Sequence, residues 1–227
     1  MMNIRRIYGD YLKKDHELYI LSLSSKQDLD AVSYDKSGKE IPSFNELMDR
    51  LLLEPELGMD TEWKPVYGKG HIRQSLLQLS GSSLTVLIQI GNARRLTQKL
   101  CQILESPDIW KYGCGIGEDA YLLGKRFKVR IAGLVELERE ADIIHKSGKA
   151  DLPRKFCGRD RKGNPVMKGP RGLLHLYNQV MNTDLPKKDK KVTMSDWSQE
   201  QLTTDQIKYA ALDSIMSYEI GVCLSEL

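Results

Sequence analysis

Two acidic residues lie one position apart at the end of an apolar segment, in the sequence GMDTEW. The segment ELGMDTEW reads as a buried strand that runs to about Trp63, and strand alternation places Asp60 and Glu62 on one face and Thr61 on the other. Two adjacent carboxylates repel each other unless a cation lies between them, and such oxygen ligands suit Mg²⁺ or Mn²⁺. The pair is a candidate metal site, although an isolated pair with this spacing is more often an exposed strand end.

A tyrosine and an aspartate lie four residues apart near the C-terminus, in TTDQIKYAALDSIMSYEIG. Thr203 and Gln206 have the spacing of a capping box, which predicts that a helix begins near them. Residues at i and i+4 share a helical face, so Tyr209 should lie over Asp213. Taken alone, a tyrosine over an exposed aspartate is the simpler interpretation. The apolar stripe that would face the core consists of Ile207, Ala211, Ile215 and Ile220.

A further aspartate, Asp119, follows the predicted strand IWKYGCG at the start of a predicted helix over Glu118–Phe127. An acidic residue in a first helical turn stabilises the positive end of the helix, and by itself this explanation is sufficient.

Together and in this order, the three segments resemble the motifs of the DEDDy 3′→5′ exonucleases of the ribonuclease D superfamily, and above all the Werner-type exonuclease domain. GMDTEWKP is similar to the first motif, KYGCGIGEDAYLL to the second and WSQEQLTTDQIKYAALD to the third. The resemblance includes SLLQL and SDW and extends from about Leu18 to the C-terminus. None of the four histidines lies near Asp213 in the sequence, so the tyrosine subgroup fits better than the histidine subgroup.

The resemblance implies a catalytic set of Asp60, Glu62, Asp119, Tyr209 and Asp213. It implies two divalent ions, Mg²⁺ or Mn²⁺, one held by Asp60, Glu62 and Asp213, the other by Asp60 and, through water, by Asp119. Two ions could generate a nucleophile near neutral pH and stabilise the attacking and leaving oxygens. Tyr209 would orient the attacking water, because a phenol with a pKa of about 10 is a poor base. The expected substrates are DNA or RNA 3′ ends, and the expected products are nucleoside 5′-monophosphates.

The resemblance also implies a ribonuclease H-like α/β fold, and the alternation of apolar and polar segments predicts a mixed sheet flanked by helices. We expect one domain over residues 1–227, with an N-terminal extension to about residue 17 and a basic loop at 146–171. The predicted strands include LYILSL, IWKYGCG, VRIAGLVEL and a hairpin of QSLLQLSG with LTVLIQIG. Besides Glu118–Phe127, a helix is predicted at SFNELMDRLLLEPE, where Ser43 and Glu46 have the spacing of a capping box. A second predicted helix covers Ala93–Glu105. Helical periodicity also extends from about residue 173 to the end and is interrupted at TDLPKKDKK.

The sequence specifies the substrate contacts less closely than the catalytic residues. Trp63 could stack on a base or pack in the core, and the sequence favours the two equally. Leu76 in SLLQL resembles a family position that contacts the terminal base, although the pattern alone favours a core leucine. Lys187 and Lys188, with the segment Lys146–Arg171 and its nine Lys or Arg residues, could bind phosphates electrostatically. A solvated charged face is the general alternative.

Bulk composition narrows the class of protein. The chain has 227 residues, a net charge of +3 and 41% hydrophobic residues, values typical of a soluble globular protein. Its four cysteines contain no CxxC pair, which favours an intracellular, reducing compartment. The N-terminal residues MMNIRRIYGDYLKKD are too polar for a secretory signal, and no apolar run is long enough for a membrane span, so no membrane partner is expected. The choice between nucleus and cytoplasm stays open, as do the protein partners.

Two other functions fit parts of the sequence. GCGIGEDA approaches a dinucleotide-binding motif, but Glu118 and Asp119 would place negative charge where a pyrophosphate must lie. A catalytically weak or inactive exonuclease fold could serve as a nucleic-acid-binding or scaffold module. Such a protein would usually have lost one of the carboxylates, and all four are present here together with the tyrosine.

Overall fold

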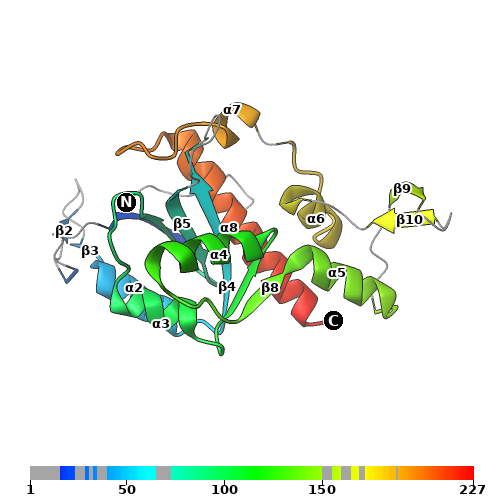
Figure 1. The fold of residues 1–227 in the computed structure, drawn as a ribbon, viewed down its shortest axis with the longest axis horizontal. Helices are drawn as coiled ribbons and strands as arrows, with labels where there is room; N and C mark the ends of the chain where they lie inside the picture. Colours follow the sequence, from blue (N-terminus) through cyan, green and yellow to red (C-terminus); the bar gives the residue numbers. More distant parts are fainter. Residues whose placement is uncertain are drawn as a thin grey trace.

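The computed structural model describes residues 16–23, 29–30, 33–34, 40–64, 73–149, 155–159, 165–168, 172–187 and 189–227, with the backbone alone at 33–34, 155–159 and 165–168. A six-stranded sheet runs through the molecule and helices cover both of its faces (Figure 1). The prediction of a mixed α/β sheet flanked by helices is confirmed.

The three longest central strands are antiparallel, and the other strands join them in parallel. The predicted hairpin is confirmed, because β5 and β6 pair with Leu79 opposite Val86. In sheet order the strands are β1 (Glu17–Ser22), β6 (Leu84–Gln89), β5 (Gln74–Ser80), β4 (Glu56–Trp63), β7 (Trp110–Gly113) and β8 (Leu134–Glu136).

One face of the sheet is covered by α2 (Phe44–Leu52), α3 (Gln98–Glu105) and α4 (Ile116–Phe127). Their apolar side chains form the larger core with the strand residues that point to this face, such as Met59 and Leu77. The predicted capping box at the start of α2 is present: Glu46 N donates to the Ser43 hydroxyl and Ser43 N donates to the Glu46 carboxylate.

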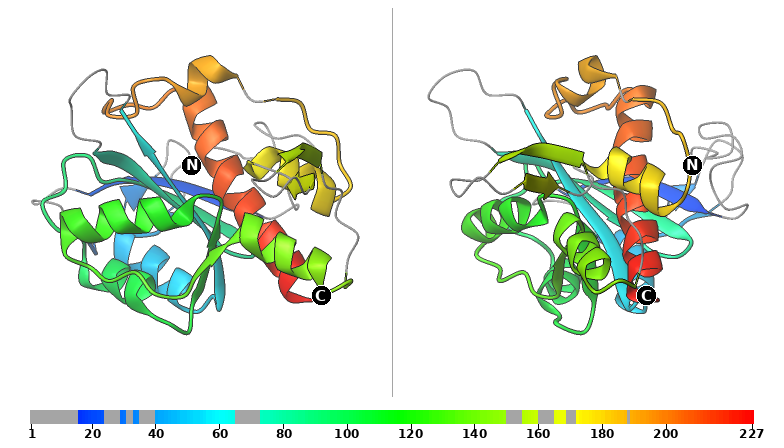
Figure 2. Two further views of the ribbon diagram at one scale, coloured as in Figure 1. Left: turned by 45° about the vertical axis from the view of Figure 1, so that its right-hand side comes forward. Right: turned by 90° about the vertical axis from the view of Figure 1, so that its right-hand side faces the viewer.

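The opposite face carries the long C-terminal helix α8 (Thr204–Ser225), which Figure 2 shows across the sheet from α2, α3 and α4. Beside it lie α5 (Leu137–Lys146), α6 (Leu173–Val180) and the short α7 (Lys190–Thr193). The predicted capping box of Thr203 and Gln206 begins α8. Its predicted stripe is buried, at Ile207, Ala211, Ile215 and Ile220.

The helix α8 crosses β4 at very short range because residue 58 has no side chain. A Cβ atom on Gly58 would lie 1.9 Å from the Ser214 carbonyl oxygen and 2.5 Å from the Tyr218 nitrogen. Alternation along β4 puts residue 58 on the same face as Asp60 and Glu62. The glycine therefore brings α8 down onto the strand that carries the first two candidate ligands.

The predicted helix at Ala93–Glu105 is too long, since α3 begins at Gln98. The hydroxyl of Thr97 accepts from Leu100 N and caps the helix there, as threonine often does. Upstream, the carbonyl of Ala93 accepts a hydrogen bond from the Arg126 guanidinium. The segment before Thr97 is thus held by a side chain from α4 rather than by helical hydrogen bonds.

The predicted strand VRIAGLVEL is also too long, since β8 covers only Leu134–Glu136. Ala132 N donates to the Leu104 carbonyl at the end of α3 instead of to a strand. Gly133 then has a φ of +65°, a conformation that extended strands do not use. The pattern detected the apolar residues but not this tertiary contact.

The segment expected to be a basic loop contains a hairpin of β9 (Lys155–Arg159) and β10 (Pro165–Lys168). The short strands β2 (Ser33–Tyr34) and β3 (Glu40–Ile41) form another antiparallel pair. The remainder of 150–171 and most of the expected N-terminal extension lie outside the described residues. No helix in the described ranges is long and apolar enough to cross a membrane.

Candidate active site

Three carboxylates from two distant parts of the chain converge at one point. Asp60 and Glu62 come from β4 and Asp213 comes from α8, and one oxygen from each lies within 4.8 Å of the others. Glu62 is 9% exposed and Asp213 only 4% exposed. Such a group of partly desolvated oxygens can surround a hard divalent cation, whose charge would offset the mutual repulsion.

Asp119 lies beside this group without being part of the three-carboxylate cluster. It is 6% exposed, and its carboxylate accepts a hydrogen bond from the Thr61 hydroxyl. Burial, with a smaller contribution from the charge of Asp60, raises the pKa of Asp119 to about 7. A bound cation nearby would favour the ionised form, so a proton and a metal would compete at this residue. The contribution of Thr61 was not predicted, although its position between two candidate ligands placed it on the opposite face.

Tyr209 lies one helical turn before Asp213, and both line the same cleft. Burial raises the pKa of Tyr209 to about 12, and the charges of Glu62 and Asp60 act in the same direction. The phenol is therefore neutral near pH 7 and suited to hydrogen bonding rather than to proton abstraction. Its ring packs against Trp197, with the ring centroids 5.8 Å apart.

The residues around Trp197 form hydrogen bonds that hold the start of α8 in place. The Gln206 amide donates to the Ser195 hydroxyl at 2.9 Å and to the Asp196 carbonyl at 3.1 Å. The Asp196 carboxylate forms an ion pair with Lys64 at 2.8 Å, next to the end of β4. The sequence SDW was part of the resemblance, but its role in supporting Tyr209 was not predicted. The only signal for that role was the placement of SDW before the third motif.

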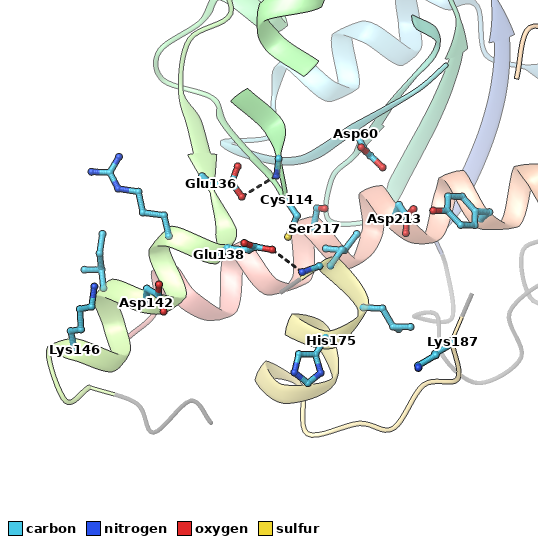
Figure 3. A pocket seen from close by; sticks show the side chains of 17 residues that line it. Asp60, Cys114, Glu136, Glu138, Asp142, Lys146, His175, Lys187, Asp213 and Ser217 are labelled. Carbon is cyan, nitrogen blue, oxygen red and sulfur yellow. Dashed lines mark hydrogen bonds between the residues drawn. The ribbon is translucent and has the colours of Figure 1, made fainter. Parts of the chain in front are cut away.

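A cleft of about 1100 Å³ extends from the carboxylates to α5 and α6. Figure 3 shows Asp60 and Asp213 at one end and Lys146 and Asp142 at the other, with His175 and Lys187 on the α6 side. The predicted substrate contact Lys187 lies on this wall. Sequence reasoning had not identified the neighbouring cleft residues Arg139 and His175, because Arg139 lies among acidic residues and His175 among apolar ones.

The other predicted substrate contacts have different surroundings. Trp63 is 37% exposed at the end of β4, so it is not a core tryptophan. Leu76 is completely buried among Leu18, Leu87 and residues of α8, which is the core position that the pattern alone favoured. Lys188 lies outside the described residues.

The dinucleotide-binding alternative conflicts with the turn between β7 and α4. There Gly115 N donates to the Glu136 carboxylate at 3.0 Å, and Glu118 and Asp119 occupy the first helical turn. Three acidic side chains thus surround the helix end that would have to receive a pyrophosphate. This helix end does not offer an anion site.

Comparison with known proteins agrees with this geometry. A bifunctional 3′-5′ exonuclease/ATP-dependent helicase WRN from Mus musculus is 32% identical over 160 residues, which is 70% of this chain but only 10% of that much longer protein. The crystal structure of the Aedes aegypti Nibbler EXO domain matches with a TM-score of 0.64 at 18% identity, covering 95% of this chain and 90% of that one. Escherichia coli RNase D, described as an exoribonuclease involved in structured RNA processing, matches with a TM-score of 0.56 at 22% identity, covering 80% of this chain and 42% of its own.

The model of a protein family described as 3′-5′ exonuclease matches residues 39–226, which include every candidate catalytic residue. The ribonuclease H-like fold and the resemblance to the ribonuclease D superfamily are thereby confirmed. This chain belongs to the 3′-5′ exonuclease domain family.

Proposed function

We propose that this chain removes nucleotides one at a time from the 3′ ends of DNA or RNA, using Mg²⁺ or Mn²⁺, and releases nucleoside 5′-monophosphates. The observation that carries the proposal is the convergence of Asp60, Glu62 and Asp213 within 4.8 Å of one another. Hydrolysis of a terminal phosphodiester at this point would place its phosphate against the carboxylates, an arrangement that requires cations.

The donor set fits two divalent ions. All ligands are carboxylate oxygens, which Mg²⁺ and Mn²⁺ prefer. Asp60, Glu62 and Asp213 would hold one ion, while Asp60 and, through water, Asp119 would hold the second. When bound, the ions would supply Lewis acidity and neutralise the negative charge that develops on the phosphate.

The protein's own groups then position the reactants. Tyr209 is neutral at physiological pH, so its hydroxyl orients the attacking water by a hydrogen bond rather than deprotonating it. Thr61 holds the carboxylate of Asp119 from the other face of β4. Trp197 fixes the ring of Tyr209, so that the hydroxyl meets the water in one orientation.

The exposed Trp63, which follows Glu62 on β4, and the cleft lysine Lys187 are proposed to contact the substrate. Trp63 can stack on a base, and Lys187 can pair with a phosphate. The neighbouring Lys188 and the basic segment Lys146–Arg171 would extend the phosphate-binding surface along the polynucleotide.

A degradation panel tests the function. The substrates are 5′-labelled single-stranded DNA, single-stranded RNA and duplexes with a recessed 3′ end, each incubated with Mg²⁺, Mn²⁺ or EDTA. A ladder of labelled products that shortens from the 3′ end and disappears in EDTA is expected. Immediate release of a labelled 5′ mononucleotide, or a ladder unchanged in EDTA, would contradict the proposal. The same panel with Asp60→Ala protein prepared in parallel controls for a contaminating nuclease.

The alternative is an inactive exonuclease fold that binds nucleic acid or acts as a scaffold. It predicts weak Mn²⁺ binding and no ladder, whereas the intact carboxylate set predicts tight binding. Calorimetric titration of the purified chain with Mn²⁺ separates the two. Four carboxylates and Tyr209 in the described structure favour the enzyme.

A further inference from the structure

Gln78 is a fully buried amide in the middle of β5. Its side chain is 0% exposed, and neither its nitrogen nor its oxygen has a hydrogen-bond partner among the residues that the structure describes. Buried amides are normally hydrogen-bonded, because leaving both ends desolvated and unpaired destabilises the fold. A buried amide without a partner at the centre of a sheet therefore points to a partner that it meets only when the site is occupied.

The position of Gln78 identifies that partner. In the register of the sheet Gln78 lies directly opposite Asp60, and Leu76 lies opposite Glu62. Directly opposed residues of an antiparallel pair point to the same face, with their Cβ atoms about 5 Å apart. The face is the one covered by α8, because the next residue on it, Ser80, donates to the Ser214 hydroxyl at 2.7 Å. Gln78 thus lies between the carboxylate cluster and the apolar residues beneath α8.

Other polar groups under α8 fall into two sets. Ser80, Ser214 and Thr85 satisfy one another by hydrogen bonds. Ser217, one turn after Asp213 on the wall of the cleft, is 1% exposed, and its hydroxyl also has no partner within the described part of the chain. Among these polar groups under α8, the serines and threonine next to Gly58 are paired, whereas Gln78 opposite Asp60 and Ser217 one turn after Asp213 are not.

We propose that Gln78 is a positioning residue for the metal site: its amide nitrogen donates a hydrogen bond to the carboxylate of Asp60 when divalent ions are bound. This inference rests on the proposed function. A carboxylate has about four lone-pair directions, so it can bind a cation on one side and accept an N–H on the other. Groups that hold a ligand from behind fix its orientation and strengthen the site. In the structure the Asp60 carboxylate accepts a hydrogen bond from Thr61 N at 2.9 Å, and the Gln78 amide has no partner among the described residues.

The variant Gln78→Met tests the idea, because methionine keeps the length and apolar volume of the side chain but removes the donor. We expect metal-free Gln78→Met to melt at the same or a higher temperature than the wild type, since an unpaired amide is removed. We expect its Mn²⁺ affinity, measured by calorimetry, to be about ten-fold weaker. The matched control is Ser80→Ala on the same strand and face. It breaks a satisfied hydrogen bond, so it should lower the melting temperature and leave Mn²⁺ affinity unchanged.

Each outcome bears on the inference. If the wild type binds Mn²⁺ and Gln78→Met binds it equally well, the positioning role is overturned while the proposed function stands. A wild type that binds no Mn²⁺ overturns both. A second measurement needs no variant: in wild-type protein carrying ¹⁵N-glutamine, saturating Mg²⁺ should shift the Gln78 side-chain amide signals and slow their hydrogen exchange. Unmoved signals would equally overturn the inference.

Discussion

Two of the places where the sheet buries polar groups are built in opposite ways. At Lys111 on β7, a fully buried ammonium donates to three backbone carbonyls, those of Ile103 at 3.0 Å, Ser106 at 2.7 Å and Ile109 at 2.8 Å. These carbonyls lie at and just beyond the end of α3. A cation at that end of a helix is favourable, so this site is complete without any ligand.

At the other end of β4, groups of like charge are brought together instead. Asp60, Glu62 and Asp213 converge, burial raises the pKa of Asp119 to about 7, and Gln78 is buried without a partner in the described structure. The Lys111 site has satisfied its hydrogen-bonding groups within the fold, and burial lowers the pKa of Lys111 to about 8. The carboxylate site instead gathers like charges, as is typical where function competes with stability.

The largest expected effect comes from removing a carboxylate. Asp213→Ala or Asp60→Ala should lower single-turnover cleavage by about 1000-fold or more, since losing a metal forfeits several kcal/mol of transition-state stabilisation. Metal-free thermal stability should stay the same or rise, because repulsion is relieved. The control is Asp205→Ala, an exposed aspartate in the first turn of the same helix. Substantial activity in a folded Asp213→Ala protein would locate the chemistry elsewhere.

Gly58→Ala should affect both fold and site. Its Cβ would overlap the Ser214 carbonyl, so α8 must move away from β4 and carry Asp213 with it. We expect a loss of about 3 kcal/mol in unfolding free energy, at the upper end of ordinary overpacking, together with weaker Mn²⁺ binding. Urea unfolding and calorimetry measure the two. Gly117→Ala is the control, because nothing lies within 4 Å of the added atom; equal behaviour of the two variants would contradict the close crossing.

Lys111→Met should remove the hydrogen bonds of the Lys111 site and leave the carboxylate site intact. Three buried carbonyls lose their donor, which should lower the unfolding free energy by about 2–3 kcal/mol. Mn²⁺ affinity and cleavage at low temperature should not change. Urea unfolding with Lys125→Met, an exposed lysine on α4, as control would show this. A Lys111→Met protein as stable as the wild type would mean that the ammonium contributes little.

Tyr209→Phe should lower cleavage by about 10- to 100-fold, equivalent to about 1.4–2.7 kcal/mol, because only the hydroxyl that orients the water is lost. The ring keeps its contact with Trp197, so Asp213 stays in place. Single-turnover rates at saturating Mg²⁺ and substrate binding in Ca²⁺ separate chemistry from binding. A wild-type rate would exclude Tyr209 from the mechanism, and lost binding would make its role structural.

The last prediction concerns the pH dependence of stability in the metal-free protein. The folded-state pKa of Asp119 is raised above its ordinary value, from 3.8 to about 7, so the metal-free folded protein binds more protons than the unfolded chain between these values. Its stability should therefore fall as pH rises from about 4 to about 7, by at most about 1.4 kcal/mol per pH unit from this group. In EDTA, Asp119→Asn should show a flatter decline in urea unfolding than the wild type. Identical slopes would contradict the raised pKa.

Local patterns in the sequence determined much of this protein. Alternation put Asp60 and Glu62 on one face of a strand, and the four-residue spacing put Tyr209 and Asp213 on one face of a helix. The capping boxes at Ser43 and Thr203 indicated where two helices begin, and both are present. These features depend on neighbours two to four positions away, so the local sequence is enough to predict them. The ordered motifs supplied the family and, with it, the fold.

Only the tertiary structure decided how these pieces meet. The close crossing at Gly58, the hydrogen bond from Thr61 to Asp119 and the burial of Leu76 each join segments far apart in the sequence. The start of α3 and the short β8 depended on contacts from α4 and α3 that no local pattern records. Strand register and the distance of closest approach between α8 and β4 set which side chains share the site. Both are properties of packed elements, and for that reason the spacing of residues along the chain could not specify them.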